Sequence, residues 1–231
     1  MLSDNEPMGQ ILNIQVKVDK RLYVNDPFNS DLGRKLIAEG TVQLNQIGVE
    51  KFTFRKLAKK TSCTEAAVYR YFENKYKLLN YIISWYYGWL EYHIVFTVNQ
   101  KEKPADKIDK LIDLLTEAVE TDPNVKDISN NDVHELVIRE NIKVIHTVIT
   151  DEELDKQGYS FAFNNIINRI QSLLEQLSCD PKTSRSLASF VFFQSQQMSF
   201  LSKHRKTLVN NDLEDFKKYI GEMVKTKCKC S

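Results

Sequence analysis

Glycine and proline are scarce: the chain of 231 residues has 7 glycines and 5 prolines. Because these residues supply the tight turns of many-stranded sandwiches and barrels, their scarcity argues against an all-β fold and favours long helices. Cysteine is also rare, with 4 residues scattered along the chain, and no signal peptide is apparent at its start. Together these features predict a reduced, cytoplasmic protein with no disulfide framework.

No charge of one sign dominates, since 32 basic residues face 31 acidic ones and the net charge is +1. Any electrostatic function must therefore come from an uneven distribution of charge along the chain.

Long hydrophobic runs are missing as well. Residues 81–98 are mostly apolar or aromatic, but they include Glu91, and a carboxylate in mid-membrane costs roughly 2.5 to 3.5 kcal/mol. This stretch predicts a buried helix, and no membrane partner is expected.

Residues 1–29 form an N-terminal arm with a pattern of its own. Its apolar side chains alternate with polar ones at Ile14, Val16 and Val18. A period of two predicts a short strand or β hairpin. A disordered arm is an equal alternative, because a lone hairpin is marginal without something to pack on. We expect the arm to pack against the body of the domain.

Capping residues divide the rest of the chain into about nine helices, which makes the predicted fold all-α. Ser30 and Gly48 delimit the first helix as N-cap and C-terminal stop. A short second helix follows at 54–60, a third at 64–72, and a long fourth begins after Asn74. Later helices are predicted to begin near Pro104, Thr150, Asp180 and Asn211.

Positive charge gathers in this N-terminal region. Residues 31–80 contain ten basic and five acidic side chains, a surplus of +5 against +1 for the whole chain, so the remainder nets −4. A basic module joined to an acidic one is typical of a protein that places one end on phosphates.

Three helices joined by tight turns, with a short second helix, predict a helix-turn-helix unit. Its last helix fits a major groove about 12 Å wide. On that helix, Ala66, Ala67 and Arg70 are expected on or near one exposed face. Val68 and Phe72, four residues apart, are expected to face the core.

The run TEAAVYRYF at 64–72 is followed by Asn74-Lys75, and FTF at 52–54 is followed by Leu57-Ala58. With Gly48 closing the first helix, these residues agree in type and spacing over some 45 positions with one known pattern. The chain resembles the N-terminal DNA-binding domain of the TetR family of bacterial transcription repressors.

The resemblance implies two domains after the arm: a helix-turn-helix DNA-binding domain at 30–76 and a larger helical ligand-binding and dimerisation domain at 77–231. It also implies a homodimer formed through the last two long helices, about 182–203 and 212–227. Such a dimer would be a repressor on a palindromic operator in double-stranded DNA, released by a small-molecule effector. Two alternatives stay open: a ligand-independent dimeric DNA-binding regulator, and a helical protein-interaction adaptor that no longer binds DNA.

Carried over by position, the resemblance implies phosphate contacts from Thr53 and Lys75, and contacts of two tyrosines with the backbone beside the groove. Base reading falls to Glu65, Ala67 and Arg70, whose side chains suit a cytosine amino group, a thymine methyl group and guanine. Glu65 is explained equally well as a carboxylate at a helix start. The expected DNA-binding residues are Thr53, Arg55, Thr64, Glu65, Ala67, Tyr69, Arg70, Tyr71 and Lys75.

The turn before the third helix departs from the family pattern. It is Thr61-Ser62-Cys63 where the family usually has Ala-Gly-Val, so it lacks the residue best suited to a positive φ. The tilt of the reading helix is therefore in question. Cys63 is expected to replace the valine as a small hydrophobic residue.

Beyond the fourth helix start there is no motif, only amphipathic helices. Aromatic and polar side chains on these helices are candidates for an effector pocket, with ordinary core packing as the alternative. The candidate pocket residues are Trp85, Trp89, Tyr92, His93, His134, His146, Gln194 and Gln197.

Enzymatic and metal sites are not expected. His134-Glu135 begins a zinc-protease pattern, but Ile138 stands where the second histidine is needed. The chain has no glycine-rich phosphate loop and no nucleophile elbow. Cys228 and Cys230 fall short of a four-ligand zinc site and are expected in an unstructured end. The sequence predicts no enzyme, no cofactor and no metal.

Overall fold

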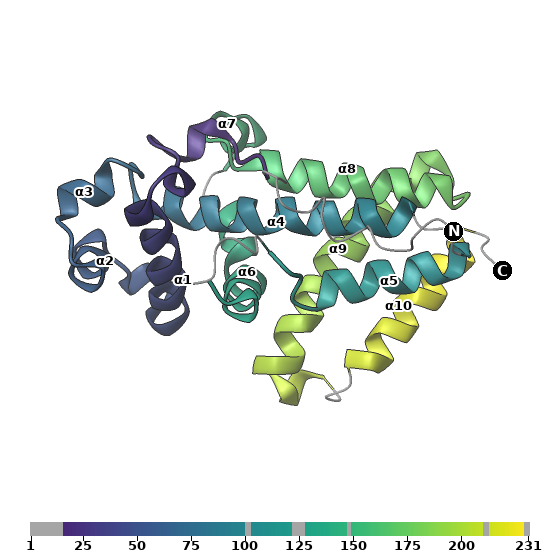
Figure 1. Ribbon diagram of the computed structural model, residues 1–231. Helices are drawn as coiled ribbons and strands as arrows, with labels where there is room; N and C mark the ends of the chain where they lie inside the picture. The colour runs from purple at the N-terminus through teal and green to yellow at the C-terminus, as the bar shows by residue number, and fades with distance from the viewer. Residues whose placement is uncertain (1–15, 100–102, 122–127, 147–148, 210–212, 229–231) are drawn as a thin grey trace, which may run out of the picture.

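The computed structural model describes residues 16–99, 103–121, 128–146, 149–209 and 213–228 (Figure 1). Within these ranges the fold is all-α, as predicted, and has ten α-helices and no strand. The helices are α1 (Asp31–Lys51), α2 (Phe54–Thr61), α3 (Glu65–Tyr69), α4 (Lys75–Asn99), α5 (Pro104–Thr116), α6 (Asn130–Ile145), α7 (Asp151–Lys156), α8 (Ser160–Gln176), α9 (Pro181–His204) and α10 (Leu213–Lys227).

The predicted caps form. Ser30 Oγ accepts a hydrogen bond from the Gly33 backbone N–H at 3.0 Å and begins α1. The helical path of α1 breaks at Gly48, where φ is +72°. Asn74 Oδ1 accepts from the first backbone N–H groups of α4 at 3.0 Å. Thr150 and Asp180 likewise cap α7 and α9, while Asn211 lies outside the described residues.

The helix-turn-helix elements α1 to α3 lie at one end of the molecule, and α4 runs from them through the body, flanked by α6 and α8 (Figure 1). Because both faces of α4 are covered, its side chains from Tyr81 to Tyr87 are all buried. In the described part of the chain, no helix is both long enough and apolar enough to span a membrane.

The N-terminal arm packs against α4, and in its described part the predicted hairpin is absent. Val16 lies so close to Gly88 that a Cβ there would collide with the valine side chain. Leu22 is fully buried, and Lys77 Nζ donates to the backbone oxygens of Arg21 and Gln157 at 2.9 and 2.8 Å. The alternating residues Val16 and Val18 therefore pack against the helical core and do not pair in a strand. The third residue of the pattern, Ile14, lies outside the described residues.

The prediction of cysteines without a disulfide is wrong for one pair. Cys179, in the turn between α8 and α9, is bonded to Cys228, at the end of α10. Cys228 is fully buried, which also corrects the expected unstructured end at this residue. The two positions are 49 residues apart, and only the packing of α10 against α5 and α9 brings them together. Cys230 lies outside the described residues.

Candidate nucleic-acid interface

Two threonines start the helices of the helix-turn-helix. Thr53 Oγ1 accepts from the Lys56 N–H at 3.3 Å, and Thr64 Oγ1 accepts from the Ala67 N–H at 3.1 Å. Each hydroxyl thus accepts from a backbone N–H group in the first turn of its helix that has no partner within the helix. Helix α3 ends at Tyr69, earlier than predicted, because the Tyr71 N–H bonds the Val68 oxygen three residues back at 2.9 Å and so interrupts the i→i−4 series.

The turn between α2 and α3 reaches the required geometry without glycine. Ser62 adopts the left-handed conformation, with φ 56° and ψ 40°. Its N–H and that of Cys63 both bond the Ala58 oxygen, which closes the end of α2. Such a conformation costs an L-residue roughly 1 to 2 kcal/mol, so the rest of the fold imposes it. Cys63 is partly buried and packs on the core, as expected of a small hydrophobic residue.

The outer surface of α2 and α3 carries most of the predicted DNA-binding residues. Six of the nine have exposed side chains: Thr53, Arg55, Thr64, Glu65, Tyr69 and Arg70. The Tyr69 side chain is 49% exposed, and its ring contacts the Phe54 ring edge-on at 5.0 Å. Asn25 Nδ2 of the arm donates to the Arg70 backbone oxygen at 2.6 Å, which fixes the end of α3.

Positive charge on this surface is not neutralised within the protein. Among the described residues, no ion pair engages five exposed cationic side chains: Lys51, Arg55, Lys59, Lys60 and Arg70. Unpaired cations on the helix-turn-helix elements are what a polyanion such as the phosphate backbone attracts.

Ala67 does not lie on that face. It is 9% exposed, whereas Ala66 is exposed. The expectation that both alanines share the exposed face is therefore wrong for Ala67. Each helical residue is rotated by about 100° from the next, so Ala67 lies off the face that carries Glu65 and Ala66.

Two predicted contacts are engaged inside the protein. The Tyr71 hydroxyl lies 2.8 Å from Ser30 Oγ at the start of α1. Lys75 Nζ donates to the backbone oxygens of Val49 and Glu50 at 2.8 and 3.1 Å, just beyond the break at Gly48. In this structure both side chains hold the helix-turn-helix together.

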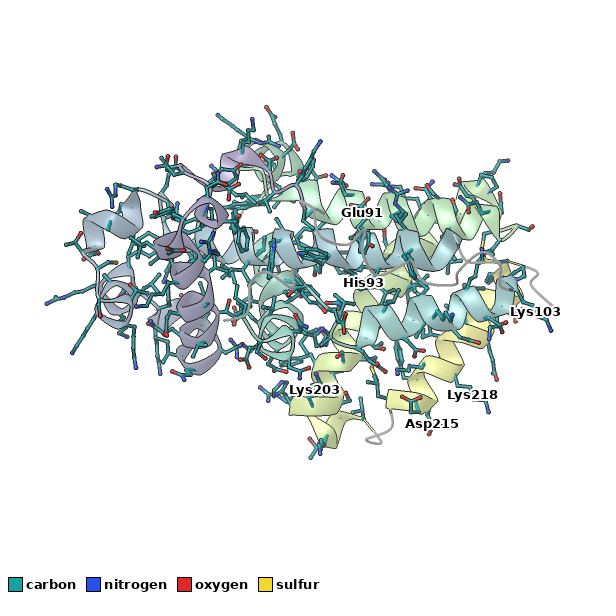
Figure 2. The ribbon with its side chains drawn as sticks, viewed as in Figure 1. Glu91, His93, Lys103, Lys203, Asp215 and Lys218 are labelled. Carbon is teal, nitrogen blue, oxygen red and sulfur yellow. A yellow bond between two sulfur atoms is a disulfide. The ribbon has the colours of Figure 1, made fainter. Side chains whose placement is uncertain are left out.

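The candidate pocket residues do not form one cluster. Trp85, Trp89 and His134 are buried, whereas the side chains of His146 and Gln194 are exposed. Tyr92, His93 and Gln197 are half-buried. Figure 2 places His93 along α4, where its Nε2 lies 2.8 Å from the Glu120 backbone oxygen. His146 lines a separate pocket of about 280 Å³ between the end of α1, the start of α4 and the end of α6.

His134 lies at the centre of a buried polar cluster that sequence reasoning missed in part. Its Nδ1 is 2.9 Å from the Tyr86 hydroxyl, and its Nε2 is 3.2 Å from Ser199 Oγ, which donates to the Thr116 oxygen. Burial lowers the pKa of His134 to about 4, so the ring is neutral at pH 7. Ser199 stands between Met198 and Phe200 on α9, and a small polar residue among large apolar ones is the sequence signal that could have pointed to this cluster.

Several buried polar atoms on α4, α6 and α9 lack a hydrogen-bond partner among the described residues. They are Trp89 Nε1 on α4, Asn141 Oδ1 on α6, and Ser195 Oγ and Gln196 Oε1 on α9. Because an unsatisfied buried polar group costs about 1 to 3 kcal/mol, water or a ligand is a suitable partner for these atoms.

A capped short helix, a closed turn and an exposed, unpaired basic face define the class of protein: a helix-turn-helix DNA-binding protein. Residues 36–82 match the family model described as "Bacterial regulatory proteins, tetR family". Over these residues the helix-turn-helix domain of this chain is similar to the DNA-binding domain of the TetR family. No curated protein matches the chain in sequence.

Solved structures share the fold over nearly the whole chain. A tetR-family regulatory protein from Rhodococcus RHA1 has a TM-score of 0.61 at 12% identity, covering 87% of this chain and 99% of that one. The fatty acid degradation regulator FadR from Bacillus halodurans has a TM-score of 0.59 at 14% identity, covering 82% and 96%. A TetR variant from Acinetobacter baumannii in complex with minocycline has a TM-score of 0.51 at 13% identity, covering 83% and 93%. The chain therefore shares its fold with these structures.

Proposed function

We propose that the chain is a homodimeric transcriptional repressor that binds a palindromic operator and is released by a small-molecule effector. The observation that carries this proposal is the outer face of α2 and α3. It presents Arg70 and Glu65 for bases, and basic side chains without ion pairs among the described residues for phosphates.

A dimer is proposed because a single helix-turn-helix covers one half-site, and two copies related by a twofold axis read a palindrome. Phe190 on α9 is 43% exposed, and Arg185 of α9 donates to Asn168 of α8 at 2.6 Å, so α8 and α9 present one continuous surface. The family resemblance implies an interface formed by the last two long helices, α9 and α10. However, α10 is bound to α5, because Lys217 pairs with Asp113 at 3.1 Å. We therefore assign the interface to α8 and α9.

The effector is proposed to bind among the unsatisfied polar atoms of α4, α6 and α9 beside His134. The Acinetobacter neighbour with minocycline is a precedent for a small molecule in this fold. Helix α6 contacts the first helix of the helix-turn-helix domain directly. The Arg139 guanidinium donates to the Leu44 and Asn45 backbone oxygens of α1 at 2.6 and 2.9 Å. If an effector binds more tightly when α6 occupies one of two positions, it favours that position. The contact with α1 would then move the helix-turn-helix.

Selection of bound sequences from random duplex DNA, with the salt dependence of binding recorded, tests this function. The proposal predicts a palindrome with two half-sites centred about one helical turn or a multiple apart. Recovery of a single half-site would remove the dimer from the proposal. Recovery of nothing above random sequence, by a protein that is folded, would favour the adaptor alternative.

A further inference from the structure

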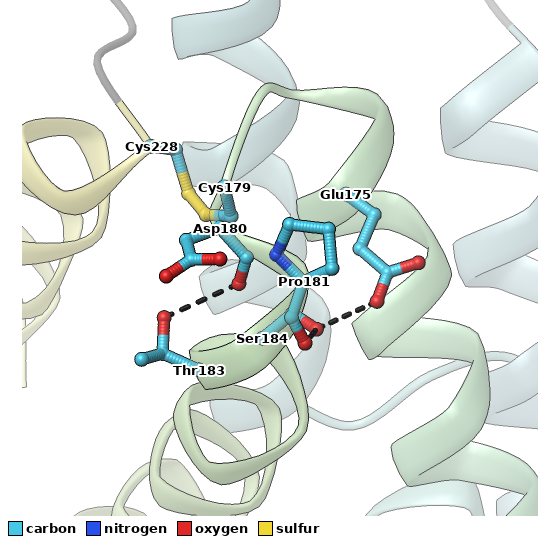
Figure 3. The surroundings of a disulfide bond; sticks show 7 residues. All are labelled: Glu175, Cys179, Asp180, Pro181, Thr183, Ser184 and Cys228. Carbon is cyan, nitrogen blue, oxygen red and sulfur yellow. Dashed lines mark hydrogen bonds between the residues drawn. A yellow bond between two sulfur atoms is a disulfide. The ribbon is translucent and has the colours of Figure 1, made fainter.

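A disulfide joins the turn before α9 to the end of α10 (Figure 3). Its cysteines, Cys179 and Cys228, are 4% and 0% exposed. The bond closes a loop that contains both α9 and α10. It therefore ties α10 to the helix pair assigned above to the dimer interface.

Each cysteine is held by a helix end that forms independently of the bond. The Cys179 N–H donates to the Leu174 oxygen at 3.0 Å, and the next residue, Asp180, caps α9 through the Lys182 N–H at 3.0 Å. The Cys228 N–H donates to the Val224 oxygen at 2.9 Å and extends the last turn of α10. Two thiols placed in this way stay close after reduction, so the bond is able to re-form.

Ion pairs keep α10 on α5 without the disulfide. Lys217 is 8% exposed, and its Nζ contacts Asp113 at 3.1 Å and Glu117. About two turns further along α10, Lys225 pairs with Asp109 at 2.6 Å. Reduction is therefore expected to loosen the end of α10 while the helix stays in place.

We propose that Cys179 and Cys228 form a reversible thiol–disulfide exchange site for low-molecular-weight disulfides, and that the bond sets how firmly α10 is attached. This inference rests on the proposed function, because a bacterial DNA-binding regulator works among cellular thiols that keep most cysteines reduced. A disulfide in that compartment is usually transient and redox-sensing.

The exchange proceeds in two balanced steps. Reduction loosens the end of α10 and exposes the otherwise buried Cys228 thiol, whose thiolate attacks the small disulfide, forms a mixed disulfide and releases one small thiol. The second cysteine thiolate then attacks the mixed disulfide and releases the other small thiol. Two cysteine thiols are oxidised to one disulfide, and one small disulfide is reduced to two thiols.

The test equilibrates the full chain in buffers of reduced and oxidised glutathione at varied ratio. Thiols are then trapped by alkylation, counted by mass spectrometry, and the melting temperature of each sample is measured. The proposal predicts one reversible transition within the glutathione range and an oxidised form that melts about 5 to 15 °C higher. Cys228→Ser should abolish the transition, whereas Cys63→Ser and Cys230→Ser should keep it.

Three results would overturn the exchange site: no Cys179–Cys228 bond in oxidised glutathione, a bond that survives the most reducing glutathione buffer, or equal melting temperatures in both states. A bond that survives the most reducing buffer would be a permanent structural disulfide. Binding of the same samples to a selected operator is a separate readout. Failure to bind DNA in either state would refute the proposed function and leave the thiol result intact.

Discussion

Replacement of Ser62 by glycine should stabilise the protein. Ser62 has φ 56° and ψ 40°, where an L-residue is disfavoured by roughly 1 to 2 kcal/mol. Its side chain is exposed, and no hydrogen bond of the hydroxyl with a described residue is observed. Glycine relieves the strain but gives the unfolded chain more freedom, which offsets about 0.5 to 1 kcal/mol. The net gain expected for Ser62→Gly is about 0.5 to 1 kcal/mol.

Urea denaturation and thermal melting measure this gain. The expected rise in melting temperature is about 1 to 4 °C for a chain of this size. Ser62→Ala is the matched control, since it removes the hydroxyl and retains the Cβ that causes the strain. Equal stability of the two variants, or a lower stability of Ser62→Gly, would refute the argument that this turn stores backbone strain.

The other predictions concern the dimer, the buried histidine and Lys75. Phe190→Glu should convert a dimer to a monomer in light scattering, whereas Tyr219→Glu, on the exposed face of α10, should not; dissociation by both would contradict the α8–α9 assignment. Because the folded pKa of His134 is lowered to about 4, the protein should lose up to about 3 kcal/mol of stability as pH falls from 6.5 to 4. His134→Gln should flatten this dependence in urea titrations, and an unchanged profile would exclude His134 as its source. Lys75→Ala should lower the free energy of unfolding by about 1 to 2 kcal/mol, because Nζ bonds two backbone oxygens. Arg55→Ala should instead reduce the salt slope of DNA binding by about one, and the opposite pattern would restore Lys75 to phosphate contact.

Features set by neighbouring residues could be predicted from the sequence. Ser30, Gly48 and Asn74 act on backbone groups within a few positions of themselves, so each was placed correctly as a cap or stop. The five-residue length of α3 was not predicted, because the Tyr71 N–H bonds the Val68 oxygen three residues back and interrupts the helix early. Placement of Ala67 failed for a related reason, since one residue on a helix is a rotation of about 100°.

Contacts between distant segments could not be predicted. The partners of the Lys75 ammonium group are backbone oxygens more than twenty residues away, which carry no sequence signature. The disulfide of Cys179 depends on where α10 packs, and four scattered cysteines do not reveal that packing. The Arg139 contact with α1 likewise spans more than ninety residues. In each case tertiary structure decides the role of a side chain whose local pattern is ordinary.

The central claim is that the exposed face of α3 reads DNA bases. Its most direct test is the affinity of wild type and Arg70→Ala for a selected operator and for random duplex DNA at the same salt concentration. The account predicts that Arg70→Ala loses about 1 to 3 kcal/mol per half-site on the operator and almost nothing on random DNA. Equal losses on both would show that Arg70 contacts phosphates only, and no loss on either would contradict the assignment of α3 as the reading helix.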